Sequence, residues 1–381
     1  MAVARGRGAV LAVAGVALVA ACSAGGGAGG GRAAGDATYP GSSWATVDPA
    51  AAGFDPVALD RLAAAAEAGG SSCLAVTRDG ELVDERHWAG TGADTPREAF
   101  SVTKSVTSVL VGIAADDGDL DLSAPAADHL PAWRGTPAGE VTVEDLLSND
   151  SGRHWDLATD YVDLLRAPDK DAFAAALPQD APPGTTWAYN NSAIQNLSAV
   201  LADATGGAPA AFADRRLFEP IGMAHSAMSR DGAGNTLAFM GLQTTCLDLA
   251  RFGYLVLRGG TWDGEQVVSH GFVERATGAP STPLNAGYGW LFWLNRPGPI
   301  VGPLEATTGR PGEDVAHGQL VPGAPADVVW ALGLNEQVVA VLPSEGVVAV
   351  RMGAQPPAGA PFGRDELTRG VLDALDGAPG G

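Results

Sequence analysis

The stretch Phe100-Ser101-Val102-Thr103-Lys104-Ser105-Val106-Thr107 contains one of only two lysines among the 381 residues. Apart from Lys170, every other basic charge of the Lys/Arg type is an arginine. Lys104 opens an apolar run that is predicted to be helical over 101–115, where a surface lysine is poorly explained. Ser101 and Lys104 are three residues apart, so they lie on the same side of a helical turn. A serine nucleophile needs such a nearby amine when no histidine acts as its base, and the stretch therefore indicates a serine nucleophile with a lysine base.

A second polar group supports this interpretation. Tyr189-Asn190-Asn191 follows a Pro/Gly-rich turn at 181–184 and directly precedes a helix predicted over 192–204. Tyr189 and Asn191 are two residues apart in an extended approach to that helix, so their side chains point the same way. A tyrosine hydroxyl can handle a proton, and an amide can hold a substrate carbonyl or the lysine. Ser-x-x-Lys is common by chance, and this second group makes it informative.

Predicted strands cluster at both ends of the chain. Asp79-Gly80 predicts a two-residue hairpin between strands at 73–78 and 81–86. Further strand patterns follow in the last third, at 287–293, 328–334, 337–342 and 346–352. Helices are expected over 57–68 and 364–375, and a mainly helical region extends from about 120 to 280. The prediction is an α+β fold, with an antiparallel β-sheet built from both chain ends, flanked by helices and interrupted by the helical region. An active site is expected between the sheet and the helical region, because pockets form preferentially between such structural units.

Together these motifs resemble the serine β-lactamase and penicillin-binding-protein superfamily, in its class C-like branch. That branch includes D-alanyl-D-alanine carboxypeptidases, esterases and 6-aminohexanoate-dimer hydrolases, and it implies a β-lactamase/transpeptidase-like fold. In the class C-like branch Tyr-x-Asn takes the place of the S-D-N motif of class A enzymes. The resemblance also covers the segments 146–152, 183–191, 218–223, 248–253 and 288–289.

The resemblance implies a role for each motif residue. Ser101 would attack an ester or amide carbonyl to form an acyl-enzyme, and Lys104 would take its proton. Burial lowers a lysine pKa, so a neutral amine near pH 7 is expected. Tyr189 would pass protons to the leaving group and help to activate water, and Asn191 would orient Lys104 or the substrate carbonyl.

The third motif departs from the family pattern. By position it falls at Ala331-Leu332-Gly333, where the β-lactam and peptide enzymes carry Lys or His at the first residue. Gly333 is retained, and the N–H of Leu334 is expected to complete an oxyanion hole with the N–H of Ser101. The missing cation removes the usual anchor for a substrate carboxylate. This favours an ester or amide substrate without that carboxylate.

Two further positions are weighed as site residues. Trp155-Asp156 resembles the loop on the substrate side of the oligoamide hydrolases, but a packed surface loop explains it as well. His317 lies in the Gly/Pro-rich stretch 309–323 and is the one candidate to replace the missing cation. The histidines show no metal-ligand spacing, and no metal or cofactor is expected.

The amino terminus is typical of an exported protein. Residues 1–22 combine a basic start with a short apolar run, which predicts a cleaved signal peptide rather than a membrane span. The run ends on Cys22 and resembles a bacterial lipobox, so Cys22 is expected to carry lipid. Residues 23–50 are predicted to be a flexible linker, and residues 51–376 the hydrolase domain. The expected location is the bacterial cell envelope, on the outer face of the membrane.

The amino-acid composition indicates which binding partners and which covalent links to expect. The net charge of −21 argues against nucleic acid, because phosphate binding requires a basic face. An exported protein permits a disulfide between Cys73 and Cys246; two buried free thiols are the alternative.

The sequence thus predicts an exported serine hydrolase that acts on a small-molecule or short-peptide ester or amide. The alternatives are a β-lactamase or D-Ala-D-Ala carboxypeptidase, and a catalytically silent envelope protein that binds peptidoglycan fragments or β-lactams. Retention of Lys104 argues against the silent protein, which has no need of a base.

Overall fold

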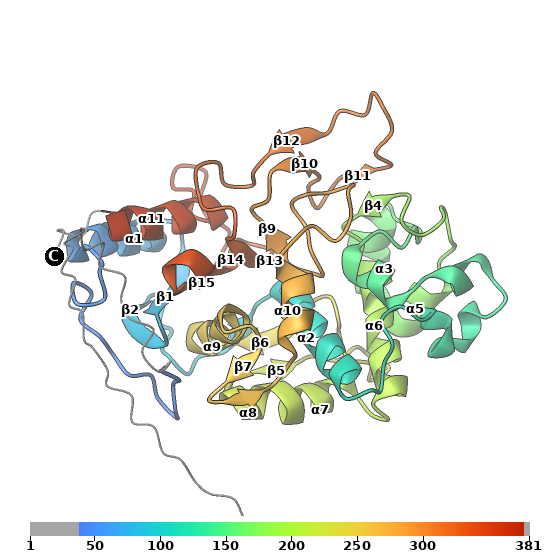
Figure 1. The fold of residues 1–381 in the computed structure, drawn as a ribbon, viewed down its shortest axis with the longest axis horizontal. Helices are drawn as coiled ribbons and strands as arrows, with labels where there is room; N and C mark the ends of the chain where they lie inside the picture. The colour runs from blue at the N-terminus through green and yellow to red at the C-terminus, as the bar shows by residue number, and fades with distance from the viewer. Residues whose placement is uncertain (1–37, 377–381) are drawn as a thin grey trace, which may run out of the picture. The chain divides into compact units, whose positions relative to one another are not determined.

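The computed structural model is described for residues 38–376 (Figure 1). The predicted signal peptide (1–22), the lipidation of Cys22 and the first part of the predicted linker (23–37) lie outside the described residues. Within residues 38–376, no helix is both long enough and apolar enough to cross a membrane.

A six-stranded antiparallel sheet joins the two ends of the described chain. Its strand order is β2-β1-β15-β14-β13-β9. The strands are β1 (Ser71–Arg78), β2 (Glu81–His87), β9 (Trp293–Leu294), β13 (Val329–Gly333), β14 (Gln337–Leu342) and β15 (Val347–Gly353). Ala75 of β1 lies opposite Val350 of β15, so segments from opposite ends of the sequence are direct neighbours. The predicted α+β architecture is confirmed.

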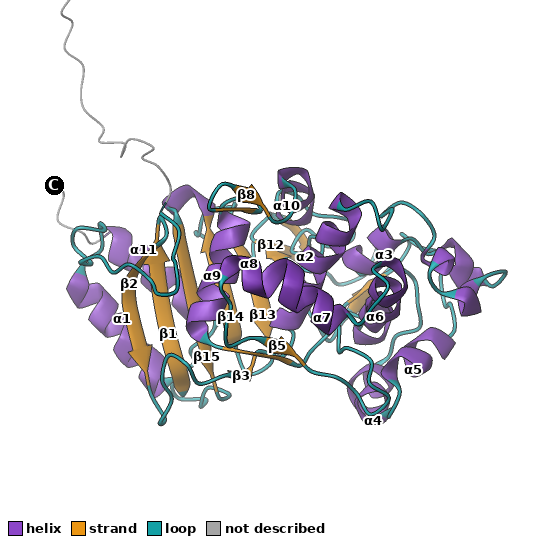
Figure 2. Ribbon diagram, turned by 90° about the horizontal axis from the view of Figure 1, so that it is seen from below, coloured by secondary structure: helices purple, strands orange, loops and turns teal. Residues whose placement is uncertain are grey.

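Helices cover both faces of this sheet. α1 (Pro56–Ala68) and α11 (Arg364–Asp376) pack together on one face, while α9 (Cys246–Leu257) and α2 (Val102–Asp116) contact it from the other (Figures 1 and 2). Because both faces are covered, β14 and β15 are apolar and buried along nearly their whole length, without polar alternation. Gly253 lets α9 approach closely, since a Cβ there would lie 2.5 Å from Val348 Cγ1.

The region between the sheet strands is mainly helices, helical turns and loops, as expected. Its helices are α3 (Val143–Ser148), α4 (Leu164–Arg166), α5 (Lys170–Ala176), α6 (Asn191–Ala204), α7 (Pro209–Ala213), α8 (Glu219–Ile221) and α10 (His270–Thr277). The short helical turns of the chain are η1 (Ala126–Asp128), η2 (Pro131–Trp133), η3 (Pro137–Glu140), η4 (Thr159–Asp163), η5 (Asp214–Phe218) and η6 (Pro343–Glu345). Small strand pairs connect these parts: β3 (Arg97–Glu98) and β5 (Ala227–Met228) with β6 (Leu242–Thr244), β4 (Trp187–Ala188) with β11 (Ala306–Thr307), β7 (Thr261–Trp262) with β8 (Glu265–Gln266), and β10 (Gly298–Ile300) with β12 (Ala316–Gly318).

The strand predicted over 287–293 is wrong for most of its length. Only Trp293 belongs to β9, and the residues before it form a tight turn. Leu291 has a φ of +59°, and its N–H donates to the carbonyls of Gly289 and Leu147. Aromatic content suggested a strand, whereas these contacts with other elements fix a turn.

The predicted linker over 23–50 also differs from the structure in its described part. Residues 38–50 lie against the domain, where the Tyr254 hydroxyl donates to the Thr38 carbonyl at 2.8 Å and Arg251 Nη2 donates to the Gly41 carbonyl at 2.6 Å. The N–H of Val47 donates to the Leu82 carbonyl on the outer strand β2. These backbone contacts could not be read from the polarity of the segment.

Cys73 on β1 and Cys246 on α9 form a disulfide. The sequence left this pairing open against two free thiols. The bond links the sheet to the helix that covers it.

Candidate active site

The turn into α2 positions Ser101. Phe100, immediately before it, has a φ of +48°, which is costly for a bulky residue and is found where the surroundings impose it. Thr103 supplies part of that constraint, because its hydroxyl donates to the Phe100 carbonyl at 2.5 Å and accepts the Leu242 N–H at 3.0 Å. Ser101 therefore becomes the N-cap residue of α2.

Lys104 lies directly against Ser101. Its Nζ is 2.8 Å from Ser101 Oγ and 2.9 Å from the Phe239 carbonyl oxygen, and the residue is only 1% exposed. Burial lowers the pKa of Lys104 to about 7, although the negative charge of Asp160 partly opposes this. A substantial share of Lys104 is thus neutral at neutral pH and able to accept the serine proton.

Tyr189 completes the group. Its side chain hydrogen-bonds with that of Ser101, and its ring centroid lies 4.6 Å from Lys104 Nζ. The ring stacks on Trp293 of β9, and the Tyr189 carbonyl accepts the Trp155 indole N–H at 3.1 Å. Burial raises the pKa of Tyr189 well above its usual value, so the hydroxyl keeps its proton and can donate it. Ser101, Lys104 and Tyr189, predicted as a unit, are brought together.

Asp160 is a site residue that the sequence did not reveal. It is 1% exposed and accepts three hydrogen bonds at the start of α6, from the Asn191 N–H (2.8 Å), the Ser192 N–H (2.7 Å) and the Ser192 hydroxyl (2.8 Å). The carboxylate thus caps α6, which begins right after Tyr189, and it supplies negative charge near Lys104. Asp160 comes 31 residues before Asn191, and no local pattern points to that contact.

Asn191 is near this group but makes different contacts from those expected. Its side chain hydrogen-bonds with Tyr161, and its Oδ1 is buried with no hydrogen-bond partner among the described residues. Tyr161 in turn donates to the Pro303 carbonyl at 2.9 Å. The predicted contact with Lys104 does not form as a hydrogen bond within residues 38–376.

The third-motif strand runs beside the nucleophile. A Cβ on Gly333 would lie 2.3 Å from the Ala99 carbonyl, so only glycine permits this approach. β9 pairs with β13 only at Val329 and Trp330, which leaves the backbone of 331–333 without a further strand on that edge among the described residues. Ala331 is buried and carries no charge.

Two buried side chains hold the turn that follows Leu334. Gln337 Nε2 donates to the Leu334 carbonyl at 3.0 Å and to the Asn335 carbonyl at 3.2 Å. Arg351, which is fully buried, donates to the Asn335 and Glu336 carbonyls. Asn335 and Glu336 both have positive φ. The position of Leu334, and hence of its N–H, is fixed by these contacts.

Within residues 38–376, the other two predicted positions form no hydrogen bond with Ser101, Lys104 or Tyr189. Asp156 accepts from the Thr159 N–H at 2.8 Å and pairs with His154 at 3.0 Å, and these contacts lower the Asp156 pKa to about 2. It therefore shapes the loop after Trp155. His317 lies on the exposed strand β12, opposite Pro299. Across residues 38–376, no three His, Cys, Asp or Glu side chains are grouped so as to hold a metal ion.

Residues 59–372 match the family model described as Beta-lactamase. The chain belongs to the beta-lactamase family. It is 27% identical over 218 residues to the 6-aminohexanoate-dimer hydrolase of Paenarthrobacter ureafaciens, a match covering 52% of this chain and 55% of that protein. It is 30% identical over 118 residues to the esterase/beta-lactamase LipL of Mycobacterium tuberculosis, covering 29% and 28% of the two chains. The matches thus span about half of the first relative and less of the second.

A solved structure agrees on the fold of this beta-lactamase family member. The D-alanine carboxypeptidase AmpC from Burkholderia cenocepacia superposes with a TM-score of 0.56 at 21% identity, covering 84% of this chain and 99% of that one. The predicted family and its β-lactamase/transpeptidase-like fold are confirmed.

Proposed function

We propose that this protein is a serine hydrolase that cleaves an ester or amide through an acyl-enzyme on Ser101. The observation that carries the proposal is the 2.8 Å approach of Lys104 Nζ to Ser101 Oγ, together with the lowered pKa of that buried amine. Family membership and the hydrolase names of the relatives support the same reaction class.

The reaction proceeds in two halves. Neutral Lys104 takes the Ser101 hydroxyl proton while Oγ attacks the carbonyl carbon, and the oxyanion is received by the N–H groups of Ser101 and Leu334. Tyr189 passes a proton to the leaving alcohol or amine as the carbonyl re-forms, and Lys104 restores the tyrosine proton. A water then loses its proton to this Lys104–Tyr189 pair and attacks the acyl carbon. As the bond between the acyl carbon and Ser101 Oγ breaks, the pair returns that proton to Oγ, which releases the acid and free Ser101.

The substrate is an ester or amide that lacks the carboxylate bound by the β-lactam and peptide enzymes. Ala331 stands where those enzymes carry a cation, and it is buried without a charged partner. Within residues 38–376, His317 lies on the exposed strand β12 and forms no hydrogen bond or ion pair with Ser101 or Lys104. Without a cation, a carboxylate gains no strong charge-assisted hydrogen bond.

The test compares turnover of p-nitrophenyl acetate with that of nitrocefin, using the wild type and Ser101→Ala. We expect ester hydrolysis well above nitrocefin hydrolysis, and no turnover of either by the variant in its folded form. Nitrocefin hydrolysis faster than ester hydrolysis would favour the β-lactamase alternative. Ester turnover that survives in Ser101→Ala would remove the proposed nucleophile.

We further propose that the enzyme is exported and anchored by lipid at Cys22. The basic and apolar residues before this cysteine support export, and the small residues immediately before it support lipidation. Expression in a lipoprotein-processing bacterium followed by detergent phase partition tests this. Wild type should enter the detergent phase and Cys22→Ser the aqueous phase; equal partition would contradict the anchor.

A further inference from the structure

Exposed large apolar side chains gather on the segments that border the candidate site. Among residues 38–376 they are Val57, Leu157, Val162, Leu165, Leu304 and Leu334. Val57 lies on α1 and Leu165 on α4, while Leu334 follows the third-motif strand β13. We call Leu157, Val162 and Leu304 the apolar rim; their exposed fractions are 48%, 39% and 60%. Single exposed apolar residues are ordinary, but a gathering beside one site is informative.

Leu157 and Val162 belong to the segment 155–163, which is attached directly to the catalytic group. At one end the Trp155 indole donates to the Tyr189 carbonyl. At the other end Asp160 caps α6. These two hydrogen-bonded contacts, on either side of Leu157, therefore hold the segment against the backbone at Tyr189 and Asn191.

Leu304 belongs to the segment 303–307, which is attached to the same place. The Pro303 carbonyl accepts the Tyr161 hydroxyl proton at 2.9 Å. Two residues after Leu304, β11 pairs with β4, the strand that leads into Tyr189. Trp155 and Ala306 also line one cavity, whose lining does not include Ser101, Lys104 or Tyr189. Both rim segments thus contact each other through Tyr161 and Pro303, and both are attached to the backbone around Tyr189.

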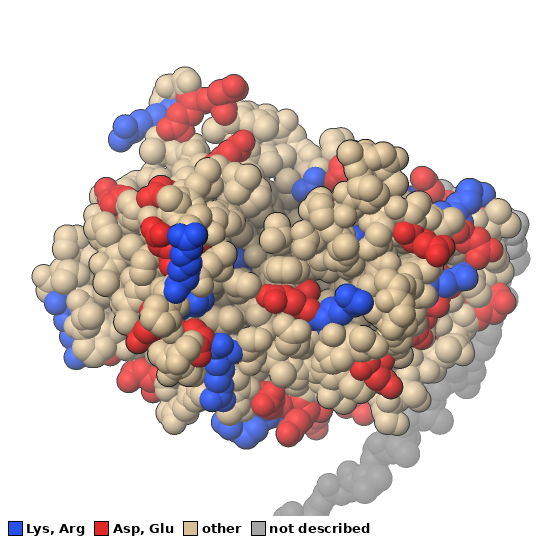
Figure 3. Space-filling model, turned by 180° about the vertical axis from the view of Figure 1, so that it is seen from behind, with Lys and Arg blue, Asp and Glu red and all other residues tan. Residues whose placement is uncertain are grey.

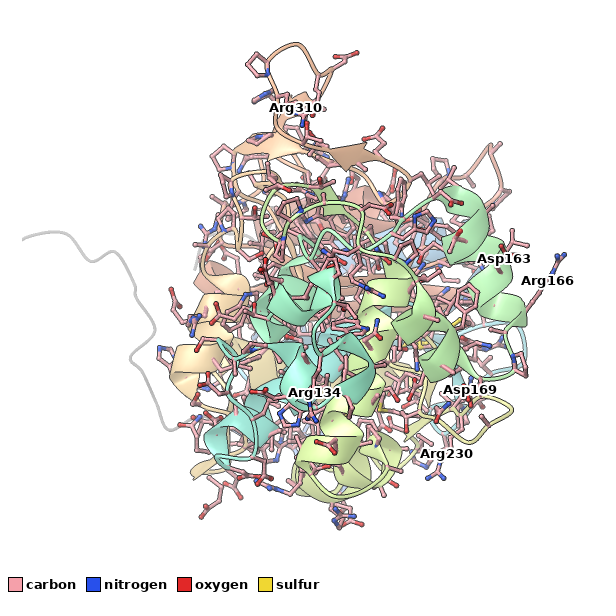
Figure 4. The ribbon with its side chains drawn as sticks, turned by 90° about the vertical axis from the view of Figure 1, so that its right-hand side faces the viewer. Arg134, Asp163, Arg166, Asp169, Arg230 and Arg310 are labelled. Atoms are coloured by element: carbon pink, nitrogen blue, oxygen red, sulfur yellow. A yellow bond between two sulfur atoms is a disulfide. The ribbon has the colours of Figure 1, made fainter. Side chains whose placement is uncertain are left out.

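The cations near the rim are committed elsewhere or point away. Arg153 is buried and donates to the carbonyls of Ala174, Ala175 and Leu177. Arg166 and Arg310 extend outward from the domain (Figure 4). Charged side chains form separate small groups on the largely uncharged face of Figure 3.

The charges interspersed with the rim are mostly negative. Asp156, Asp163 and Glu305 lie on the rim segments, and His154 is paired with Asp156 and Asp180. Negative charge at an entrance disfavours an anionic substrate. The rim therefore suits an uncharged apolar group better than a carboxylate.

We propose that the apolar rim binds the aliphatic acyl chain of an uncharged ester, so that medium-chain esters are preferred over acetate. The inference rests on the proposed serine hydrolase function and names its substrate class. Each methylene that leaves water contributes about fourfold to affinity. Burial of about two methylenes against the rim gives roughly a 15-fold preference.

The test measures kcat/KM for p-nitrophenyl acetate and p-nitrophenyl octanoate, both below their micellar concentrations. The proteins are wild type, the double variant Leu157→Ser/Leu304→Ser, each single variant, and Val57→Ser as an equally exposed control on α1. We expect wild type and Val57→Ser to favour octanoate about 15-fold. The double variant should lose most of this preference while its acetate value stays within about twofold.

Three results would overturn the inference. One is a wild type with a higher kcat/KM for the acetate ester than for the octanoate ester. Another is a rim variant in which kcat/KM falls equally for both esters. The third is a change in oligomer mass or in vesicle binding on rim substitution with an unchanged octanoate-to-acetate ratio, since the rim would then face a second copy or a membrane. A wild type that hydrolyses neither ester and is not labelled on Ser101 would instead contradict the proposed function itself.

Discussion

Replacing Lys104 by Met should abolish catalysis and at the same time stabilise the fold. Methionine has a similar length and apolar body but neither the charge nor the base. The lysine pKa falls from 10.5 to about 7 on folding because burial disfavours the ammonium form. Folding of the wild type therefore includes an electrostatic penalty that the variant does not carry.

The magnitude follows from that shift. At about 1.4 kcal/mol per pKa unit, the penalty is roughly 4 kcal/mol at pH 7. Removing the amine leaves the Phe239 carbonyl without its bond from Lys104, which costs about 1–2 kcal/mol. The variant should thus gain about 3 kcal/mol in free energy of unfolding at pH 7.

The pH dependence has a definite sign. The folded pKa lies below the unfolded one, so the penalty is complete below pH 7, shrinks between 7 and 10.5 and disappears above. The advantage of Lys104→Met should fall by about 2 kcal/mol from pH 7 to pH 9. Urea unfolding of the disulfide-intact proteins, followed by tryptophan fluorescence, measures this.

The second lysine is a matched control. Lys170 Nζ donates to the carbonyls of Leu165 and Ala167 at 3.1 and 2.8 Å, beside α4. Lys170→Met removes both bonds and should lower the free energy of unfolding by roughly 1–3 kcal/mol. A Lys104→Met variant less stable than wild type at pH 7, or a gain that does not change with pH, would refute the reasoning.

Four further predictions concern the same machinery. Ester kcat/KM should rise about tenfold per pH unit up to about pH 7 and then level off, because protonated Lys104 cannot accept the serine proton; a rate independent of pH from 5 to 8 would contradict this. Tyr189→Phe should lower kcat about 10²- to 10⁴-fold with unchanged thermal unfolding, and wild-type kcat in that variant would remove its proton-transfer role. Arg351→Met should lower the free energy of unfolding, measured in urea, by about 3 kcal/mol or more, since five hydrogen bonds are lost. A change below about 1 kcal/mol would show that the turn is stable without Arg351. Reducing the Cys73–Cys246 bond, which spans 173 residues, should cost up to about 5 kcal/mol, and an unchanged urea midpoint would mean that the bond adds no stability.

Features encoded over short distances in sequence were predictable. Asp79-Gly80 has the positive φ values of a tight hairpin, at +52° and +87°, and β1 and β2 pair around it. Ser101 and Lys104 are neighbours because helical geometry alone places residues three apart on one side. The sheet formed from both chain ends was also predictable, since β14 and β15 are nearly continuous apolar runs and β1 and β2 flank the hairpin turn.

Features that depend on distant contacts were not predictable. Asp160 sits in a segment with no recognisable pattern, and its role follows only from where α6 begins relative to η4. In the sequence, Arg351 is a single charged residue within an apolar strand. Only the fold shows that its guanidinium donates to the carbonyls of Asn335 and Glu336. The turn at 287–292 was misassigned because its backbone is held by hydrogen bonds to other elements, at Leu147 on α3 and Ala276 on α10, which no local pattern reveals.

The central claim is that Ser101 is a nucleophile activated by Lys104, and covalent labelling tests it most directly. Folded wild type, Ser101→Ala and Lys104→Met are treated with a fluorophosphonate at pH 8 and mapped by peptide mass spectrometry. We expect one adduct per wild-type chain, on Ser101, none on Ser101→Ala, and labelling at least about a hundredfold slower on Lys104→Met. A wild type that stays unlabelled, or carries the adduct on another residue, would contradict the account.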